Sequence, residues 1–361
     1  MKPSTNRMAR REALRLLSAS AAAAATTSFV RADETRASRQ TGMGLVIYDC
    51  NIRRRWMREQ DSSFDLHEPL TFMKHCHLLG AGGMQAALGV MEAKQIKALR
   101  EFADVHEMFI DAIVKPPKDK VDLSQFEAEI KTARDVGVQA ARTTIIPGRR
   151  YERFKTLEEC REFQRRGRRM LELAVPVLEK HKVMFAVENH KDQRMEERIA
   201  LYEHLDCEFV GACIDTGNSF ALLDGAYEPI EALAPYAFSV HLKDQALQPY
   251  DDGFLLGDIP LGQGSFDLKR MVNTIQKAKP KVHFSLELIT RDPLKVPCLT
   301  DQFFATMPDA LASELARTMR FVRDHPAKLQ YVSKLSPEEQ VKLEDANVAA
   351  SIAYAGKELG L

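Results

Sequence analysis

The sequence has no excess of charge of either sign. Its 361 residues include 51 Lys and Arg and 51 Asp and Glu, so the formal net charge at pH 7 is +0. Proteins that bind nucleic acid or an anionic membrane surface through their overall field are rich in basic residues. The balance gives no support for a nucleic-acid partner, and we expect the basic clusters at 53–55 and 165–169 to be solvated surfaces.

Cysteine is also scarce, and its spacing excludes one common type of metal site. Zinc ribbons hold their ion with closely paired cysteines, usually in CxxC spacing. The six cysteines lack that spacing and are Cys50, Cys76, Cys160, Cys207, Cys213 and Cys298.

Long hydrophobic runs are missing too, and the N-terminal segment has the features of an export signal instead. Arg10 and Arg11 resemble a twin-arginine motif, an alanine tract follows at 21–25, and 29–32 fits a small-residue cleavage site. The apolar stretch is too short and too weakly hydrophobic for a membrane span, so we expect none in the mature protein.

We interpret 1–32 as a twin-arginine signal peptide and 33–43 as a linker; an N-terminal amphipathic helix is the alternative. The twin-arginine route exports folded proteins, often after a cofactor has been loaded. The segment therefore predicts a periplasmic or cell-envelope location, and folding before export makes structural disulfides unnecessary.

From Gly44 onward, short apolar runs alternate with longer amphipathic stretches, which is typical of βαβ units around a parallel sheet. Eight such cycles predict an α/β fold, a (β/α)8 TIM barrel over 44–325. An open doubly wound sheet would need a glycine-rich loop after the first strand, and 48–51 is no such loop. The predicted strands are 44–49, 84–90, 108–114, 139–146, 183–188, 210–215, 237–241 and 282–287. The predicted helices are 68–80, 92–105, 122–136, 155–182, 195–206, 227–235, 266–279 and 309–324.

The segment 326–361 predicts an additional C-terminal helix. Ser336 is of a residue type that often caps helices, Pro337 follows at the first helical position, and Glu339 lies three residues after the cap. We expect this helix to run to about Lys357 and to pack onto the barrel. A subunit contact, and with it a homo-oligomer, is the alternative.

Four predicted strands each end in a potential metal ligand: Glu188, Asp215, His241 and Glu287. The ends of barrel strands converge on one face, so these side chains can surround one ion. The set contains no thiolate, and oxygen-rich sites suit Mn²⁺ or Mg²⁺, with Co²⁺ or Zn²⁺ also tolerated. Taken singly, each carboxylate is as readily a helix cap or salt-bridge partner, and His241 a core histidine.

Side chains two apart in a strand share a face, so His190 is expected above Glu188 and Lys243 above His241. Together with Tyr48 and Arg142 they are the candidate substrate contacts. A packing role is the alternative for Tyr48, Arg142 and His190, and a salt bridge to Asp244 is the alternative for Lys243.

At these positions the sequence resembles the superfamily of xylose isomerase-like barrels that contains the sugar phosphate isomerases and epimerases. The resemblance covers Gly44 to about Asp324 and implies that Glu188, Asp215, His241 and Glu287 are metal ligands, with Glu188 and Glu287 also acid and base. The motifs that carry it are 187–190 (VENH), 214–218 (IDTGN), 240–244 (VHLKD), 260–264 (PLGQG) and 286–287 (LE).

The sequence departs from the ketose 3-epimerase branch at two places. Asn218 stands where a histidine often follows the aspartate, and Lys243-Asp244 replaces small residues and a later arginine. The second-metal pattern of true xylose isomerase is also missing, which argues against a two-metal hydride shift. Export argues against phosphorylated substrates.

The expected activity is isomerisation or epimerisation of a non-phosphorylated sugar through an enediolate that a divalent ion stabilises. Alternatives are a lyase or hydrolase acting on 3-keto sugars or glycosides, and a decarboxylase of an oxidised sugar acid, with Lys243, Arg142 or His190 on the carboxylate. An apurinic endonuclease would need a histidine-rich multi-metal cluster and a basic groove, neither of which the sequence offers. A non-catalytic sugar-binding protein would not need both glutamates.

Overall fold

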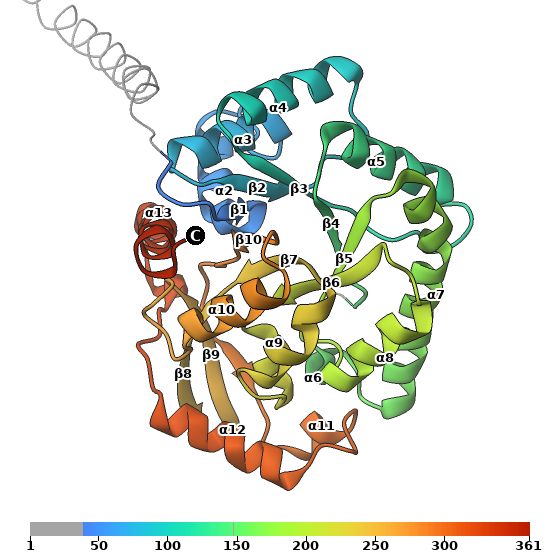
Figure 1. Cartoon of the computed structure of the whole chain (residues 1–361). Coiled ribbons are helices and arrows are strands. Elements are labelled where there is room, and N and C mark those ends of the chain that lie inside the picture. Colours follow the sequence, from blue (N-terminus) through green and yellow to red (C-terminus); the bar gives the residue numbers. More distant parts are fainter. Residues whose placement is uncertain (1–38, 147) are drawn as a thin grey trace, which may run out of the picture. The chain divides into compact units, whose positions relative to one another are not determined.

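The computed structural model describes residues 39–146 and 148–361 (Figure 1). The expected signal peptide, 1–32, and the linker residues 33–38 lie outside the described residues, so twin-arginine export stays a prediction. Within the described ranges, no helix combines the length and the hydrophobicity that a membrane span requires.

Eight parallel strands close into a barrel, as the sequence predicts. Their order around the barrel is β1-β10-β7-β6-β5-β4-β3-β2, and closure is made by β1, whose Gly44 pairs with Gly83 on one side and Ser285 on the other. The strands are β1 (Gly44–Val46), β2 (Gly83–Ala86), β3 (Phe109–Ile113), β4 (Ala140–Thr143), β5 (Met184–Glu188), β6 (Val210–Asp215), β7 (Ala237–Leu242) and β10 (His283–Leu286).

Helices surround the strands (Figure 1), and their apolar faces make the main core. Helix α5 shows how the sequence sets one: Phe126 packs edge-on against Phe185 of β5 at 5.7 Å between ring centroids, and the helix ends at Gly137, whose φ of 85° suits glycine. These helices are α3 (Pro69–Leu78), α4 (Ala93–Val105), α5 (Leu123–Val136), α7 (Leu157–His181), α8 (Met195–Leu205), α9 (Glu228–Leu233), α10 (Leu268–Ala278) and α12 (Ala312–Asp324).

The segment after β7 contains elements that the strand–helix alternation did not predict. Strand β8 (Asp244–Tyr250) turns back into β9 (Gly253–Ile259), and β11 (Leu294–Val296) adds to β9, giving a three-stranded antiparallel sheet. This sheet starts next to Lys243, directly after β7, at the carboxyl ends of the barrel strands. The remaining short helices are η1 (Ile47–Cys50), α6 (Arg150–Arg153), η2 (Asn218–Leu222), η3 (Ala234–Tyr236), α11 (Asp301–Phe304), η4 (Val332–Lys334) and η5 (Ala355–Leu359).

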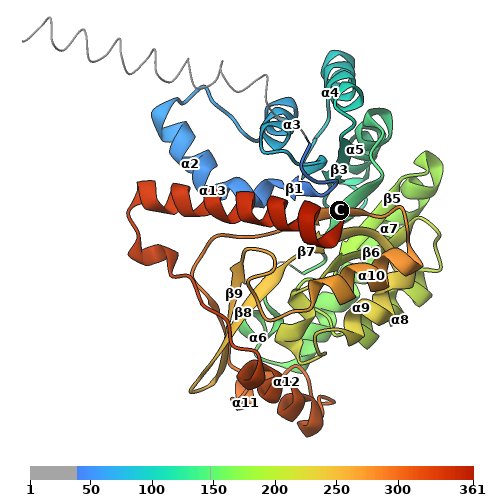
Figure 2. The same ribbon diagram turned by 60° about the vertical axis from the view of Figure 1, so that its left-hand side comes forward.

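The predicted C-terminal helix is present as α13 (Pro337–Tyr354), and it lies along α2 (Asn51–Gln60), as Figure 2 shows. Ser336 caps α13 as expected, accepting a hydrogen bond from Glu339 N. In return α13 caps α2: the buried carboxylate of Glu344 accepts hydrogen bonds from the backbone N–H groups of Ile52 (2.8 Å) and Arg53 (2.7 Å). Helix α13, near the C-terminus, therefore holds the start of α2, near the first strand.

Replacing Glu344 by Ala is expected to lower the free energy of unfolding by about 1–3 kcal/mol, because two N–H groups at the start of α2, one buried and one half-buried, lose their acceptor. Urea unfolding measures the change. The matched control is Glu338→Ala, an exposed glutamate of the same helix, for which we expect a change within about 0.5 kcal/mol. Equal effects of the two substitutions would contradict the capping role.

Candidate metal centre

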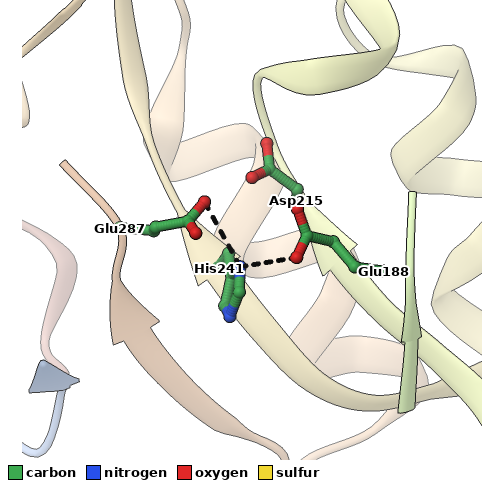
Figure 3. Close-up of side chains that lie close together, drawn as sticks. All are labelled: Glu188, Asp215, His241 and Glu287. Atoms are coloured by element: carbon green, nitrogen blue, oxygen red, sulfur yellow. Dashed lines mark ion pairs between the residues drawn. The ribbon is translucent and has the colours of Figure 1, made fainter. Parts of the chain in front are cut away.

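The structure brings together the four residues that end the predicted strands (Figure 3). Glu188 and Asp215 are the last residues of β5 and β6, His241 is the penultimate residue of β7, and Glu287 follows β10 directly. One ligand atom from each lies within 4.8 Å of all the others. All four side chains are buried, with at most 3 % exposure.

A chain of hydrogen bonds inside the barrel fixes the orientation of His241. Ser239 donates to a carboxylate oxygen of Asp111 (3.3 Å), Gln85 Nε2 donates to Ser239 Oγ (3.3 Å), and His241 Nε2 lies 2.7 Å from Gln85 Oε1. The Asp111 carboxylate can only accept, so Ser239 donates to it and in turn accepts from the amide N–H of Gln85. The amide oxygen of Gln85 must then accept from His241, so Nε2 of His241 carries the proton. Nδ1 is then the nitrogen that takes up a second proton or, in its neutral form, binds a metal ion.

Nδ1 of His241 faces the carboxylates of the cluster. His241 Nδ1 lies 3.5 Å from Glu188 Oε2 and 3.4 Å from Glu287 Oε2. His241 Nδ1 is buried without a hydrogen-bond partner in the described part of the chain, whereas Asp215 Oδ2 is paired with the Lys243 ammonium. Buried polar atoms are rarely left without a partner, and a divalent ion beside Nδ1 would satisfy it. The donor set, one imidazole and three carboxylates, fits such an ion.

Neighbouring groups hold Asp215 in place. Its Oδ1 accepts hydrogen bonds from the backbone N–H groups of Gly217 and Asn218, both 2.9 Å, which leaves Oδ2 directed toward the cluster. The side-chain amide of Asn189 pairs with the backbone of Asp215 at 2.7 and 2.9 Å. Asn189 therefore fixes the backbone that carries Asp215. Asp244 lies elsewhere, accepting from the N–H groups of the 262–264 turn.

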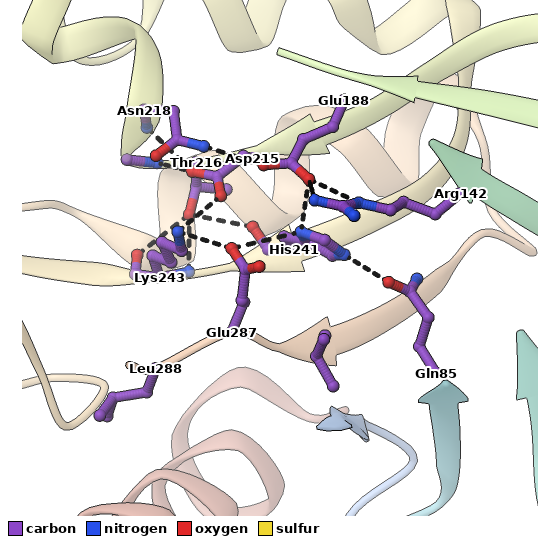
Figure 4. A network of polar contacts seen from close by, with 12 residues as sticks. Gln85, Arg142, Glu188, Asp215, Thr216, Asn218, His241, Lys243, Glu287 and Leu288 are labelled. Atoms are coloured by element: carbon purple, nitrogen blue, oxygen red, sulfur yellow. Dashed lines mark hydrogen bonds and ion pairs between the residues drawn. The ribbon is translucent and has the colours of Figure 1, made fainter. Parts of the chain in front are cut away.

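Two buried cations offset the repulsion among the carboxylates (Figure 4). Arg142 donates to Glu188 Oε2 through Nε at 2.6 Å, and Lys243 Nζ lies 3.0 Å from Asp215 Oδ2 and 2.6 Å from Glu287 Oε2. Burial raises the pKa of Glu188, but Arg142, His241 and His190 together outweigh it and leave the pKa below its usual value. Burial likewise raises the pKa of Glu287, but Lys243, His241 and Arg142 together bring it well below normal.

The pKa of Asp215 shifts in the opposite direction to those of the two glutamates. Burial dominates there and raises the pKa to about 6, although Lys243 lowers it. At His241 burial lowers the pKa, and the surrounding Cys213, Glu287 and Glu188 outweigh it, so the pKa lies well above its usual value. The negative field therefore favours a proton on Nδ1 in the absence of metal, and a divalent ion would replace that proton.

The four predicted substrate contacts lie in different surroundings. Arg142 and Lys243 are buried and engaged with the carboxylates of the cluster. Tyr48 is half-buried, with its ring centroid 6.0 Å from the Arg142 guanidinium carbon, and the half-buried His190 has Nδ1 3.1 Å from Gly148 O. Burial lowers the pKa of His190 to about 4, so its imidazole is neutral at pH 7. A substrate-binding role for these residues stays a prediction.

Sequence reasoning missed Gln85 and Lys191. Gln85 was hidden in a short apolar run of β2, where the only signal was a polar residue facing inward. Lys191 follows the VENH motif and is 2 % exposed, and its ammonium donates a hydrogen bond to Asn218 Oδ1. Burial, and then the nearby Lys243, lowers its pKa to about 8, so it remains mainly protonated at pH 7.

The closed barrel, with a buried cluster of three carboxylates and one imidazole at the carboxyl ends of its strands, defines a (β/α)8 protein whose residues could hold a divalent ion. Residues 76–321 match the family described as Xylose isomerase-like TIM barrel, and the chain belongs to this family.

Comparison with a characterised relative gives a local match. Over 120 residues, 33% of this chain, the sequence is 25% identical to 3-oxo-isoapionate decarboxylase of Pectobacterium atrosepticum. The match spans 44% of that relative's length.

Solved structures share the fold at low sequence identity. 3-keto-D-glucoside 4-epimerase from E. coli has a TM-score of 0.51 at 12% identity, covering 79% of this chain and 99% of its own. D-psicose 3-epimerase from Clostridium cellulolyticum H10 also has a TM-score of 0.51, at 13% identity, covering 80% and 92%.

The hydrogen bond from His241 to Gln85 yields a test. In Gln85→Met the imidazole loses the acceptor that fixes its protonation and ring orientation, so we expect Mn²⁺ affinity to fall about 10- to 100-fold without being abolished. Isothermal titration with Mn²⁺ measures it, and the exposed Gln125→Met is the matched control. Unchanged affinity in Gln85→Met would show that the imidazole does not bind the ion through Nδ1.

Proposed function

We propose that the protein is a divalent-metal-dependent enzyme that isomerises or epimerises a non-phosphorylated sugar through an enediolate. The observation that carries the proposal is the pair of buried, anionic glutamates on either side of His241 Nδ1, at 3.5 and 3.4 Å. Membership of the xylose isomerase-like family supports it. The oxygen-rich set favours Mn²⁺ or Mg²⁺, with Co²⁺ or Zn²⁺ accepted.

Glu188 and Glu287 are the proposed acid and base. Arg142 and Lys243 hold both pKa values below normal, so both carboxylates are anionic at neutral pH and able to accept a proton. One glutamate takes the proton from the carbon next to the carbonyl, and the electron pair passes into the enediolate. A second acid returns a proton elsewhere or on the opposite face. Bound between the four ligands, a divalent ion would supply Lewis-acid stabilisation of the developing negative charge.

If the protein is exported as predicted, its substrate is a sugar without phosphate that occurs in the periplasm or cell envelope. Tyr48 and His190, whose side chains are half-buried beside the cluster, are the proposed sugar contacts. Each offers a polar tip on a flat apolar ring, a common surface for sugars.

Decarboxylation of an oxidised sugar acid is the second candidate, supported by the local match to 3-oxo-isoapionate decarboxylase. In a 3-keto acid the bond to the carboxylate breaks, carbon dioxide leaves, and the electron pair enters an enediolate or enolate of the same kind. The two candidates therefore need the same stabilisation and differ in the bond that breaks.

Deuterium exchange tests the proposal. Mn²⁺-loaded protein is incubated in deuterated water with D-fructose, D-tagatose or a 3-keto glucoside, and NMR follows deuterium at the carbon next to the carbonyl. We expect exchange into at least one intact sugar, and at least about 100-fold slower exchange in Glu188→Gln and Glu287→Gln at saturating Mn²⁺.

The exposed Glu203→Gln serves as the control and should retain the wild-type rate. Loss of the aglycone in place of exchange would move the assignment to the lyase or hydrolase. Sugar binding without exchange in any substrate would contradict enolisation and favour a binding protein.

A further inference from the structure

Lys191 is a buried cation without a carboxylate partner. The described residues contain five buried lysines and arginines, and four of them form ion pairs: Arg142, Arg150, Arg198 and Lys243. No carboxylate in the described ranges lies within the 4.0 Å of an ion pair from Lys191, whose ammonium donates instead to the neutral amide of Asn218. Burying an unpaired charge is costly, so a site that retains one has a use for it.

The ammonium lies one side chain away from the proposed metal ligands. Asn218 accepts from Lys191 through Oδ1 and donates through Nδ2 to Glu188 Oε1 at 3.1 Å, while its backbone N–H donates to Asp215 Oδ1. Figure 4 shows Asn218 beside both carboxylates. Lys191 therefore adjoins the ligand set without contacting it.

The charges of the site indicate what this cation meets. The carboxylates of the ligand set, Glu188, Asp215 and Glu287, are matched in number by Arg142, Lys243 and Lys191. The charge of Asp258 also acts on Lys191, but Asp258 forms an ion pair with Arg291 at 3.0 Å, so this pair adds no net charge. A divalent ion therefore leaves two positive charges in excess at the site. An ionised Asp49, held by the N–H groups of Val46 and Leu288, would reduce the excess by one and leave it positive.

A neutral sugar cannot offset this excess in the ground state, whereas a sugar that carries a carboxylate does. Arg142 and Lys243 are already engaged with ligand carboxylates, which leaves Lys191, hydrogen-bonded only to a neutral amide, as the cation to pair with the substrate carboxylate. A single ammonium beside an amide suits a carboxylate better than a phosphate, whose sites combine several donors, often from the backbone.

We propose that Lys191 is a substrate-binding residue that selects keto sugars bearing a carboxylate. The inference rests on the proposed function, because it places this carboxylate on the substrate of the same metal site. It would assign to Lys191 the anchoring role that the sequence suggested for Lys243, Arg142 or His190.

Binding of D-gluconate and D-glucitol tests the proposal, since the two share a carbon chain and differ in a carboxylate against a hydroxymethyl group. Calorimetry on the Mn²⁺-loaded full chain should show D-gluconate bound at least about tenfold more tightly than D-glucitol. In Lys191→Met this preference should fall at least about tenfold, in Lys191→Arg it should largely persist, and in the exposed control Lys94→Met it should not change.

Several results would overturn the proposal. If the preference for D-gluconate is unchanged in Lys191→Met, the carboxylate binds the ion directly. If D-gluconate and D-glucitol bind equally, or neither binds detectably, no carboxylate subsite exists. If D-glucitol 6-phosphate binds more tightly than D-gluconate, the site is a phosphate site. Loss of Mn²⁺ or a lower melting temperature of Mn²⁺-loaded Lys191→Met and Lys191→Arg alike would mean a structural role.

The deuterium-exchange assay on wild-type protein separates this proposal from the proposed function. Exchange into a sugar together with a preference that ignores Lys191 defeats the subsite and leaves the function standing. A Lys191-dependent preference without exchange in any sugar defeats the enolisation mechanism and leaves the subsite standing.

Discussion

Repulsion among three buried carboxylates is the constraint on which the site depends. Glu188, Asp215 and Glu287 present oxygens within 4.8 Å of one another at the ends of strands that the closed barrel holds in fixed register. Burial makes such repulsion strong, because little water remains to screen it. Arg142 and Lys243 offset part of it, and a divalent ion shared by all three is the arrangement that offsets it most directly.

The polar interior of the barrel gives that ion its remaining ligand. From Asp111 through Ser239 and Gln85, each hydrogen bond has one consistent direction, and the last one presents His241 Nδ1 toward the carboxylates. The polar side chains inside the barrel therefore orient the imidazole of His241 as well as filling the barrel interior. In the same way α13, by capping α2, holds the segment after β1 that carries Tyr48 to the rim of the site.

The alternation of apolar runs and amphipathic stretches was sufficient to predict the eight barrel strands and the helices between them, and the capping residues 336–339 predicted α13, because each is a local pattern. The convergence of Glu188, Asp215, His241 and Glu287 also followed, since barrel closure fixes where strand ends meet. Gln85 and Lys191 could not be predicted, because their importance lies in partners 156 and 27 residues away. The β8–β9–β11 sheet was missed because its pairing is antiparallel and partly between distant segments.

The position of the ion tests the account most directly. Crystals of the protein grown with Mn²⁺ give an anomalous signal that locates the metal independently of the protein atoms. We predict one Mn²⁺ at about 2.0–2.3 Å from carboxylate oxygens of Glu188, Asp215 and Glu287 and from Nδ1 of His241. Mn²⁺ bound elsewhere, or ligated through Nε2 of His241, would contradict it.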